Sequence, residues 1–241
     1  MVALAVIGLL LGATLYLSSF GFASAYRRLL EGRGVRAVQA QILMLAAATV
    51  LFAPVLAQGA WFGREVVGAI APAGVQVAAG AFLFGIGMQL AGGCGSGSLY
   101  AAGGGQARML VVLAAFCAGS FRASLDMAFW GRLPAPEPVA LGEYAGWPAA
   151  VALQLAILAA LYALLGRLPG AGADEPPVFA ASREGIWREP WPLAAGALIL
   201  AVLNLLTLTV AGHPWSITWA FALWGAKAAR AFGWDPGTDE F

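Results

Sequence analysis

Long apolar runs separated by short polar or charged segments are the main pattern along this chain. A helix needs about 20 apolar residues to cross a bilayer, and six stretches of the sequence are of about that length. Charged residues, prolines and interfacial tryptophans mark the boundaries between them. The predicted spans are residues 2–20, 37–57, 75–102, 109–130, 147–165 and 191–210, and a shorter helix is predicted at 215–231.

The third span differs from the others in its glycine content. Residues 66–107 contain no charged side chain, and nine of the 21 residues at 85–105 are glycine. Each interior glycine costs a helix about 1 kcal/mol relative to alanine, and interrupted backbone inside a membrane occurs where it is buried in protein or lines a cavity. We therefore expect a broken helix, interrupted at residues 92–95, with Cys94 at the break and a second half-helix that begins near Ser96.

Composition and charge narrow the class of protein. The chain is 61% hydrophobic and 10% charged. This composition predicts an all-α polytopic membrane protein that lies in the lipid bilayer. The formal net charge of +1 gives no support to nucleic-acid binding. With one histidine and two cysteines, no ligand cluster for a metal is expected, and the sequence indicates no cofactor.

A weak internal repeat gives a domain organisation. Residues 21–26 overlay residues 216–221 at an offset of 195, and in both places a long span precedes and basic residues follow. This pattern favours an inverted-repeat architecture with short broken or re-entrant helices around a central glycine-cysteine loop. We expect a first membrane repeat at residues 1–166 with its break at 85–105, a polar cytoplasmic linker at 167–190, and the start of an incomplete second repeat at 191–241.

Cys94 is the leading candidate for chemistry. It would lie at a half-helix N-terminus, where free N–H groups and the positive end of the helix dipole attract an anion. The alternative is a small apolar residue in a tight helix crossing, because free cysteines are commonly buried and inert. Cys117 lies in an uninterrupted helical stretch and is expected to pack, whereas Arg122 and Asp126 are spaced to form a structural ion pair on one helix face.

The stretch Gly-Ile-Gly-Met-Gln-Leu-Ala-Gly-Gly-Cys-Gly-Ser-Gly at residues 85–97 resembles the glycine-cysteine signature of the YeeE/YedE family of membrane transporters of sulfur compounds. Residues 21–27 and 213–227 resemble two further segments of that family. The resemblance implies a bacterial inner-membrane protein that takes up thiosulfate, or a related small sulfur-containing anion, through a cysteine-lined central constriction. It also implies a TusA-like sulfur-carrier protein as a partner.

Carried onto this sequence, the resemblance gives Cys94 the role of a relay cysteine. The other expected residues of the substrate path are Gly92, Gly93, Gly95, Ser96 and Gly97, and a possible second-repeat path comprises Trp215, Ser216 and Thr218. This chain has Phe22 and Ala23 where the family usually has an early cysteine, and it ends before a second glycine-cysteine break. We therefore expect truncation after the start of the second repeat, with assembly as a homo-oligomer or with a second half-chain.

Two alternatives to a non-enzymatic transporter remain open. One is a membrane sulfur-relay enzyme that carries a persulfide on Cys94, although the sequence places neither a base nor a cation beside this cysteine. The other is a non-transporting subunit of a larger complex, which the incomplete second repeat favours.

Overall fold

The computed structural model describes residues 2–168, 178 and 191–234. The described chain is mainly helical, with almost no strand, and falls into two compact units. Unit 1 comprises Met1–Ile70 and Val139–Trp215, and unit 2 comprises Ala71–Pro138 and Ser216–Phe241. Each unit is described by itself below.

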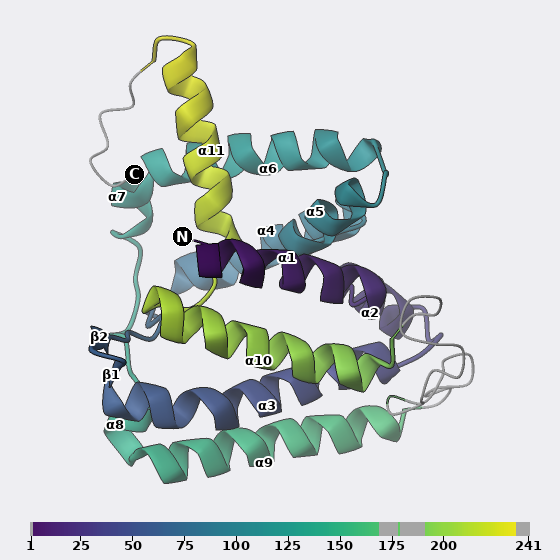
Figure 1. Ribbon diagram of the computed structural model, residues 1–241, viewed down its shortest axis with the longest axis vertical. Coiled ribbons are helices and arrows are strands. Elements are labelled where there is room, and N and C mark those ends of the chain that lie inside the picture. The colour runs from purple at the N-terminus through teal and green to yellow at the C-terminus, as the bar shows by residue number, and fades with distance from the viewer. Residues whose placement is uncertain (1, 169–177, 179–190, 235–241) are drawn as a thin grey trace. The chain divides into compact units, whose positions relative to one another are not determined.

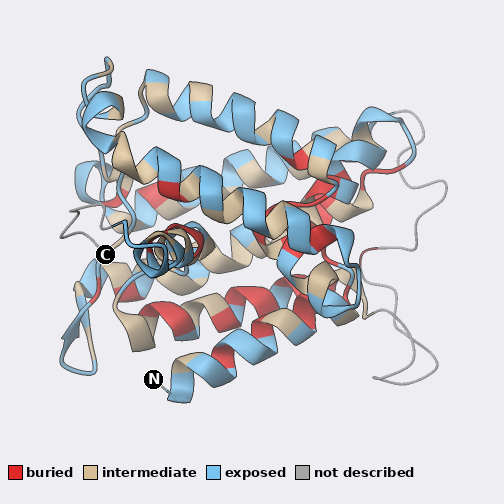
Figure 2. Ribbon diagram, turned by 90° about the horizontal axis from the view of Figure 1, so that it is seen from above, coloured by how far each residue is buried: buried red, intermediate tan, exposed pale blue. Residues whose placement is uncertain are grey.

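Unit 1 contains the longest helices of the chain. Within it α10 packs between α1 and α3, and α9 lies along α3, as Figure 1 shows. Of the most apolar 18 residues of each helix, 44% are buried in α10 and only 6% in α9, so α10 is the central helix of this unit and α9 the peripheral one. Figure 2 shows the buried residues of the described chain in red. The elements are α1 (Val2–Leu17), α2 (Phe22–Leu30), α3 (Arg36–Gln58), β1 (Ala60–Trp61), β2 (Arg64–Glu65), α8 (Leu141–Ala145), α9 (Trp147–Gly166) and α10 (Leu193–Ala211).

The first apolar run ends in a break that the sequence pattern did not predict. Residues 21–36 were expected to form a polar connector, but a second, short helix, α2, follows α1 directly. Ser19 takes a left-handed φ of 49° at the break, and Gly21 is the N-cap of α2. The side chain of Ser18 lies against α10, where a Cβ on Gly196 would be 2.6 Å from the Ser18 Cβ.

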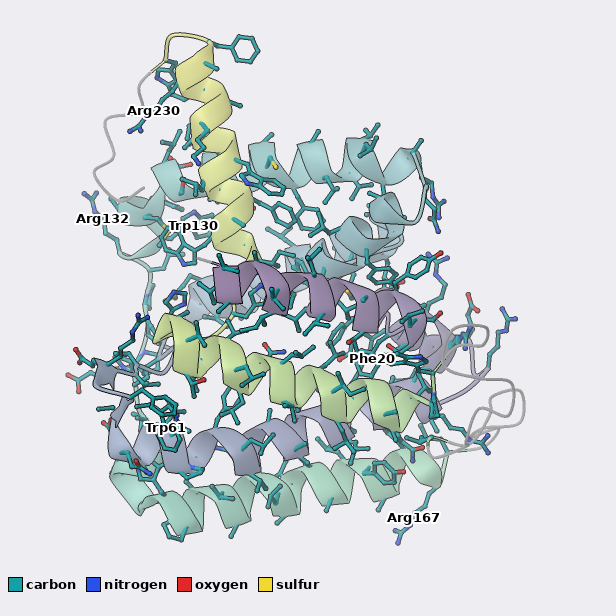
Figure 3. The ribbon with its side chains drawn as sticks, viewed as in Figure 1. Phe20, Trp61, Trp130, Arg132, Arg167 and Arg230 are labelled. Atoms are coloured by element: carbon teal, nitrogen blue, oxygen red, sulfur yellow. The ribbon has the colours of Figure 1, made fainter. Side chains whose placement is uncertain are left out.

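A two-stranded hairpin holds the C-terminal end of α10. Strands β1 and β2 pair antiparallel, and Trp61 (Figure 3) packs against a small core formed by Val55, Val66 and Leu208. The Arg64 guanidinium donates to the Val210 carbonyl at 2.9 Å. That carbonyl belongs to the last turn of α10, which has no intrahelical donor, so the arginine satisfies a helix end and complements its dipole.

Replacing Arg64 by methionine is therefore expected to destabilise the protein modestly. Loss of one exposed charged hydrogen bond at a helix C-terminus costs about 0.5–1 kcal/mol, which thermal unfolding of the purified protein in detergent would detect as a lower Tm. Arg132→Met is the matched control, because the structure gives the side chain of Arg132 (Figure 3) no hydrogen bond or ion pair within its described part. Equal Tm values for the two variants would contradict the capping role.

Unit 2 contains the broken span and the helices packed on it. Helix α6 contacts both α5 and α11. The start of α4 is held by the loop after α7, because the Val75 N–H donates to the Pro134 carbonyl at 3.1 Å. The elements are α4 (Val75–Ala91), α5 (Gly95–Gly103), α6 (Arg108–Leu125), α7 (Met127–Trp130) and α11 (Ile217–Ala231).

Six helical segments of the described chain are long and apolar enough to cross a membrane. They coincide with the six predicted spans, which confirms the all-α polytopic membrane class. The bounds differ in detail: α3 continues through Pro54, and the fourth span divides at Asp126 into α6 and α7. Most of the expected linker at 167–190 lies outside the described residues, and the assignment of 191–241 to a second repeat stays a prediction.

Candidate functional site at the glycine-cysteine break

The break predicted at residues 92–95 is present. Helix α4 ends at Ala91, Gly92 follows with a left-handed φ of 76°, and Cys94 is the N-cap of α5. The second half-helix begins at Gly95, one residue earlier than the predicted start near Ser96. Glycine is the residue that adopts the left-handed conformation without steric cost, so Gly92 ends the first helix in the manner of an ordinary C-terminal glycine cap.

The neighbouring glycines serve close approach rather than unusual backbone angles. A Cβ on Gly93 would lie 2.9 Å from the Ser98 Oγ, and a Cβ on Gly95 would lie 3.0 Å from the Phe221 Cε2. On Gly97 it would lie 3.4 Å from the Cys94 Sγ. Any side chain at these positions would press on the first turn of α5 or on the ring of Phe221.

The Cys94 thiol lies inside the first turn of α5. The Gly97 N–H donates to Sγ at 3.4 Å, and the Ser96 Oγ lies 3.4 Å from the same sulfur. Only 8% of the residue is exposed. The sulfur thus acts as the side-chain cap of the helix, in a place where the peptide dipoles of the turn converge.

Two N–H groups of this turn remain open. The first four N–H groups of a helix have no intrahelical acceptor. In α5 these four belong to residues 94–97, and of them the Gly97 N–H binds Sγ. The first intrahelical bond runs from the Ser98 N–H to the Cys94 carbonyl at 2.8 Å. Within the described part of the chain, no acceptor faces the N–H groups of Gly95 and Ser96.

Helix α11 packs on the break through apolar side chains. Phe221 and Ile217 are the nearest side chains to Gly95. Phe221 is 1% exposed and stacks on Phe116 of α6, with ring centroids 5.5 Å apart and an interplanar angle of 27°. The first turn of α5 is therefore held between two helices, with aromatic rings against its glycine face.

The expected second-repeat path residues do not make this contact. Trp215, Ser216 and Thr218 are all exposed, and Ser216 is the N-cap of α11 without a side-chain cap bond. The residues of α11 that reach Gly95 are Ile217 and Phe221. A role for these three residues in the substrate path stays a prediction.

The overlay of residues 21–26 on 216–221 aligns two helix starts. Gly21 is the N-cap of α2 and Ser216 is the N-cap of α11. The offset of 195 therefore superimposes equivalent positions of two short helices, each of which follows a long apolar helix and a left-handed residue, Ser19 or Gly212.

The other residues singled out in the sequence, Cys117, Arg122 and Asp126, make packing and surface contacts. Cys117 is partly buried in α6, and its backbone carbonyl faces Gly225 of α11. Arg122 and Asp126 form an exposed ion pair with an N–O distance of 2.6 Å, as their spacing predicted. Cys117 and Arg122 belong to α6 and Asp126 is its C-cap residue, so none of the three is part of the chain segment that forms the break.

Ser98 is the site residue that sequence reasoning missed. It is fully buried, and its hydroxyl has no hydrogen-bond partner among the residues that the structure describes. The available signal was its spacing: Ser98 is four residues after Cys94, which places both on one face of a helix that starts at Gly95.

Comparison with known proteins identifies a family for this chain. A family model described as sulphur transport matches residues 17–241, which includes both halves of the broken span and α11. A search of the curated proteins found no match, and a search of the solved structures found none either.

Proposed function

This chain belongs to the sulphur transport family, YeeE/YedE, and from that premise we propose that it carries thiosulfate, or a related small sulfur-containing anion, across the membrane past Cys94. Membership makes it a multi-pass membrane protein of sulfur-compound transport. The identity of the anion and the passage at the cysteine are the proposal.

The observation that carries the proposal is the buried Cys94 thiol at the start of α5. Open N–H groups and the helix dipole supply a positive potential equivalent to about half an elementary charge, which favours an anion. The surrounding segment, residues 66–107, contains no charged side chain. An anion held by dipoles alone is bound weakly enough to be released, which passage requires.

A thiol suits one end of thiosulfate in particular. Its S–H group is a weak donor, and its sulfur is soft and polarisable like the terminal sulfur of the anion. Gly92 adds no side chain at the break, and no described atom of another part of the chain lies within 4 Å of a Cβ placed there, so the anion can approach the backbone at this residue.

The proposal also includes the membrane in which the transporter lies and the proteins that would work with it. The expected compartment is a bacterial inner membrane, and a TusA-like carrier on the cytoplasmic side would accept the sulfur. A second copy of the chain, or a second half-chain, would supply the further thiols of a cysteine-lined constriction.

Uptake of radiolabelled thiosulfate tests the proposal directly. A cysteine-auxotrophic bacterium that lacks its own sulfate and thiosulfate importers is expected to accumulate label, and to grow on thiosulfate, when it expresses the wild-type chain. Cells with the empty vector are the control, and unlabelled sulfate, sulfite and selenite serve as competitors that define the substrate. No accumulation, with the protein confirmed in the membrane, would contradict transport by this chain.

The chemical state of Cys94 after exposure to thiosulfate distinguishes a sulfur-relay enzyme from a transporter. In such an enzyme the Cys94 thiolate would attack the terminal sulfur of thiosulfate, forming a persulfide on the protein and releasing sulfite. Mass spectrometry of the purified protein after exposure to thiosulfate is expected to show unmodified Cys94. A mass increase of one sulfur atom on this residue would favour the enzyme.

A further inference from the structure

The hydroxyl of Ser98 is an unsatisfied donor in the buried part of the site. Ser98 is 0% exposed, and its Oγ is one of three buried side-chain polar atoms without a partner in the described residues. The other two are amide oxygens, of Gln41 and Gln76, which accept hydrogen bonds. Ser98 is therefore the one of the three that can donate to an anion.

Ser98 departs from the behaviour of comparable residues in this chain. The other buried serine and threonine side chains of the described helices donate to the carbonyl four residues earlier: Thr14 to Leu10, Ser18 to Thr14, and Thr207 to Leu203. The equivalent carbonyl for Ser98 is that of Cys94, and it accepts only the Ser98 backbone N–H. A buried hydroxyl that forgoes this bond loses free energy on folding, so its orientation calls for a reason other than stability.

The hydroxyl points toward the break. A Cβ on Gly93 would lie 2.9 Å from the Ser98 Oγ and 3.2 Å from the Ser98 backbone nitrogen. Because Gly93 has no side chain, the hydroxyl meets none there. Ser98 Oγ thus faces Gly93, the residue that precedes the Cys94 N-cap.

We propose that the Ser98 hydroxyl is a second ligand of the transported anion: it donates to a sulfonate oxygen while the Cys94 thiol meets the terminal sulfur. This inference rests on the proposed transport function and adds a specificity to it. The hydroxyl is a hard donor and the thiol is soft, and the two lie one helical turn apart. Together they would bind the two chemically different ends of thiosulfate, its sulfonate oxygens and its terminal sulfur.

Equilibrium binding of radiolabelled thiosulfate to the purified full-length chain tests the assignment. Ser98→Ala is expected to raise the Kd at least tenfold. Its thermal unfolding midpoint without ligand is expected to equal or exceed that of the wild type, because the substitution removes an unsatisfied buried hydroxyl. Ser98→Cys keeps a donor, although a weaker one, and is expected to fall between the two.

Ser124→Ala is the matched control. The Ser124 hydroxyl belongs to α6 and donates to the Phe121 carbonyl at 2.7 Å, so its loss is expected to leave the Kd unchanged. Wild-type affinity in Ser98→Ala, with Cys94→Ala impaired, would overturn the inference and leave the proposed function standing. A lowered unfolding midpoint in Ser98→Ala would also overturn it, because it would show a structural role. A folded wild-type protein that binds no thiosulfate would overturn both.

Discussion

Cells that express the Cys94→Ala variant are expected to take up thiosulfate at least about tenfold more slowly than cells that express the wild-type chain. A hydrogen bond to a charged group is worth about 1.5–3 kcal/mol, and about 1.4 kcal/mol corresponds to a factor of ten. The substitution removes the thiol that we propose meets the anion and also the sulfur that accepts the Gly97 N–H. Initial rates of radiolabelled thiosulfate uptake, normalised to protein in the membrane, measure the effect.

Cys94→Ser separates the two roles of the thiol. Serine is among the preferred N-cap residues, whereas alanine at this position costs a helix about 1 kcal/mol. The serine variant is therefore expected to keep α5 and to reach the membrane at wild-type level, yet to transport slowly, because its harder and smaller oxygen does not replace sulfur against the terminal sulfur of thiosulfate.

Cys117→Ala is the control for loss of a cysteine as such. Cys117 lies in the middle of α6 and makes no side-chain hydrogen bond in the described structure, so uptake is expected to be unchanged. Wild-type uptake in both Cys94 variants would show that the thiol is a packing group, as the alternative interpretation of the sequence had it.

The largest effect on stability is expected for Gly225→Ala, in α11. A Cβ there would lie 2.5 Å from the Phe121 Cβ and 2.7 Å from the Cys117 carbonyl oxygen. One of these atoms belongs to the backbone of α6, so the two helices must move apart. Overpacking of this kind costs about 1–3 kcal/mol, and for a chain of this size the Tm in detergent is expected to fall by about 5 °C.

Gly119→Ala is the opposite case on the facing helix. Apart from its chain neighbours and the backbone of α6 itself, no described atom lies within 4 Å of a Cβ at Gly119. Replacing an interior helical glycine by alanine stabilises a helix by about 1 kcal/mol. Its Tm is expected to be equal to or above that of the wild type. Similar Tm values for Gly225→Ala and the wild type would mean that α6 and α11 are not held at the distance described.

The break in the third span was predictable because its causes are local. Glycine density, the lack of charge and the position of Cys94 are all properties of one stretch of sequence, and the helices end and begin there within one residue of the prediction. The six spans were predictable for the same reason, since the apolar length that a bilayer requires is a property of each segment.

The features that sequence reasoning missed depend on contacts between distant segments. Nothing near Gly95 in sequence indicates that Phe221 packs against it, and the missing bond of Ser98 is visible only when the directions of hydroxyl and carbonyl are known. The break before α2 was missed for a different reason. Its left-handed residue is Ser19, and a serine in that conformation carries none of the signal that a glycine does.

The peripheral position of α9 has a consequence for how this protein depends on its solvent. Polar contacts to α3 are few: Gln39 donates to the Tyr162 carbonyl at 3.2 Å, and Thr49 lies 3.4 Å from Gln154. With 20 residues, α9 is about 30 Å long, which matches the hydrocarbon thickness of a bilayer. Most of the surface of α9 is therefore left uncovered by its own unit and is available to acyl chains. A bilayer thicker or thinner than this helix is expected to strain its packing on α3.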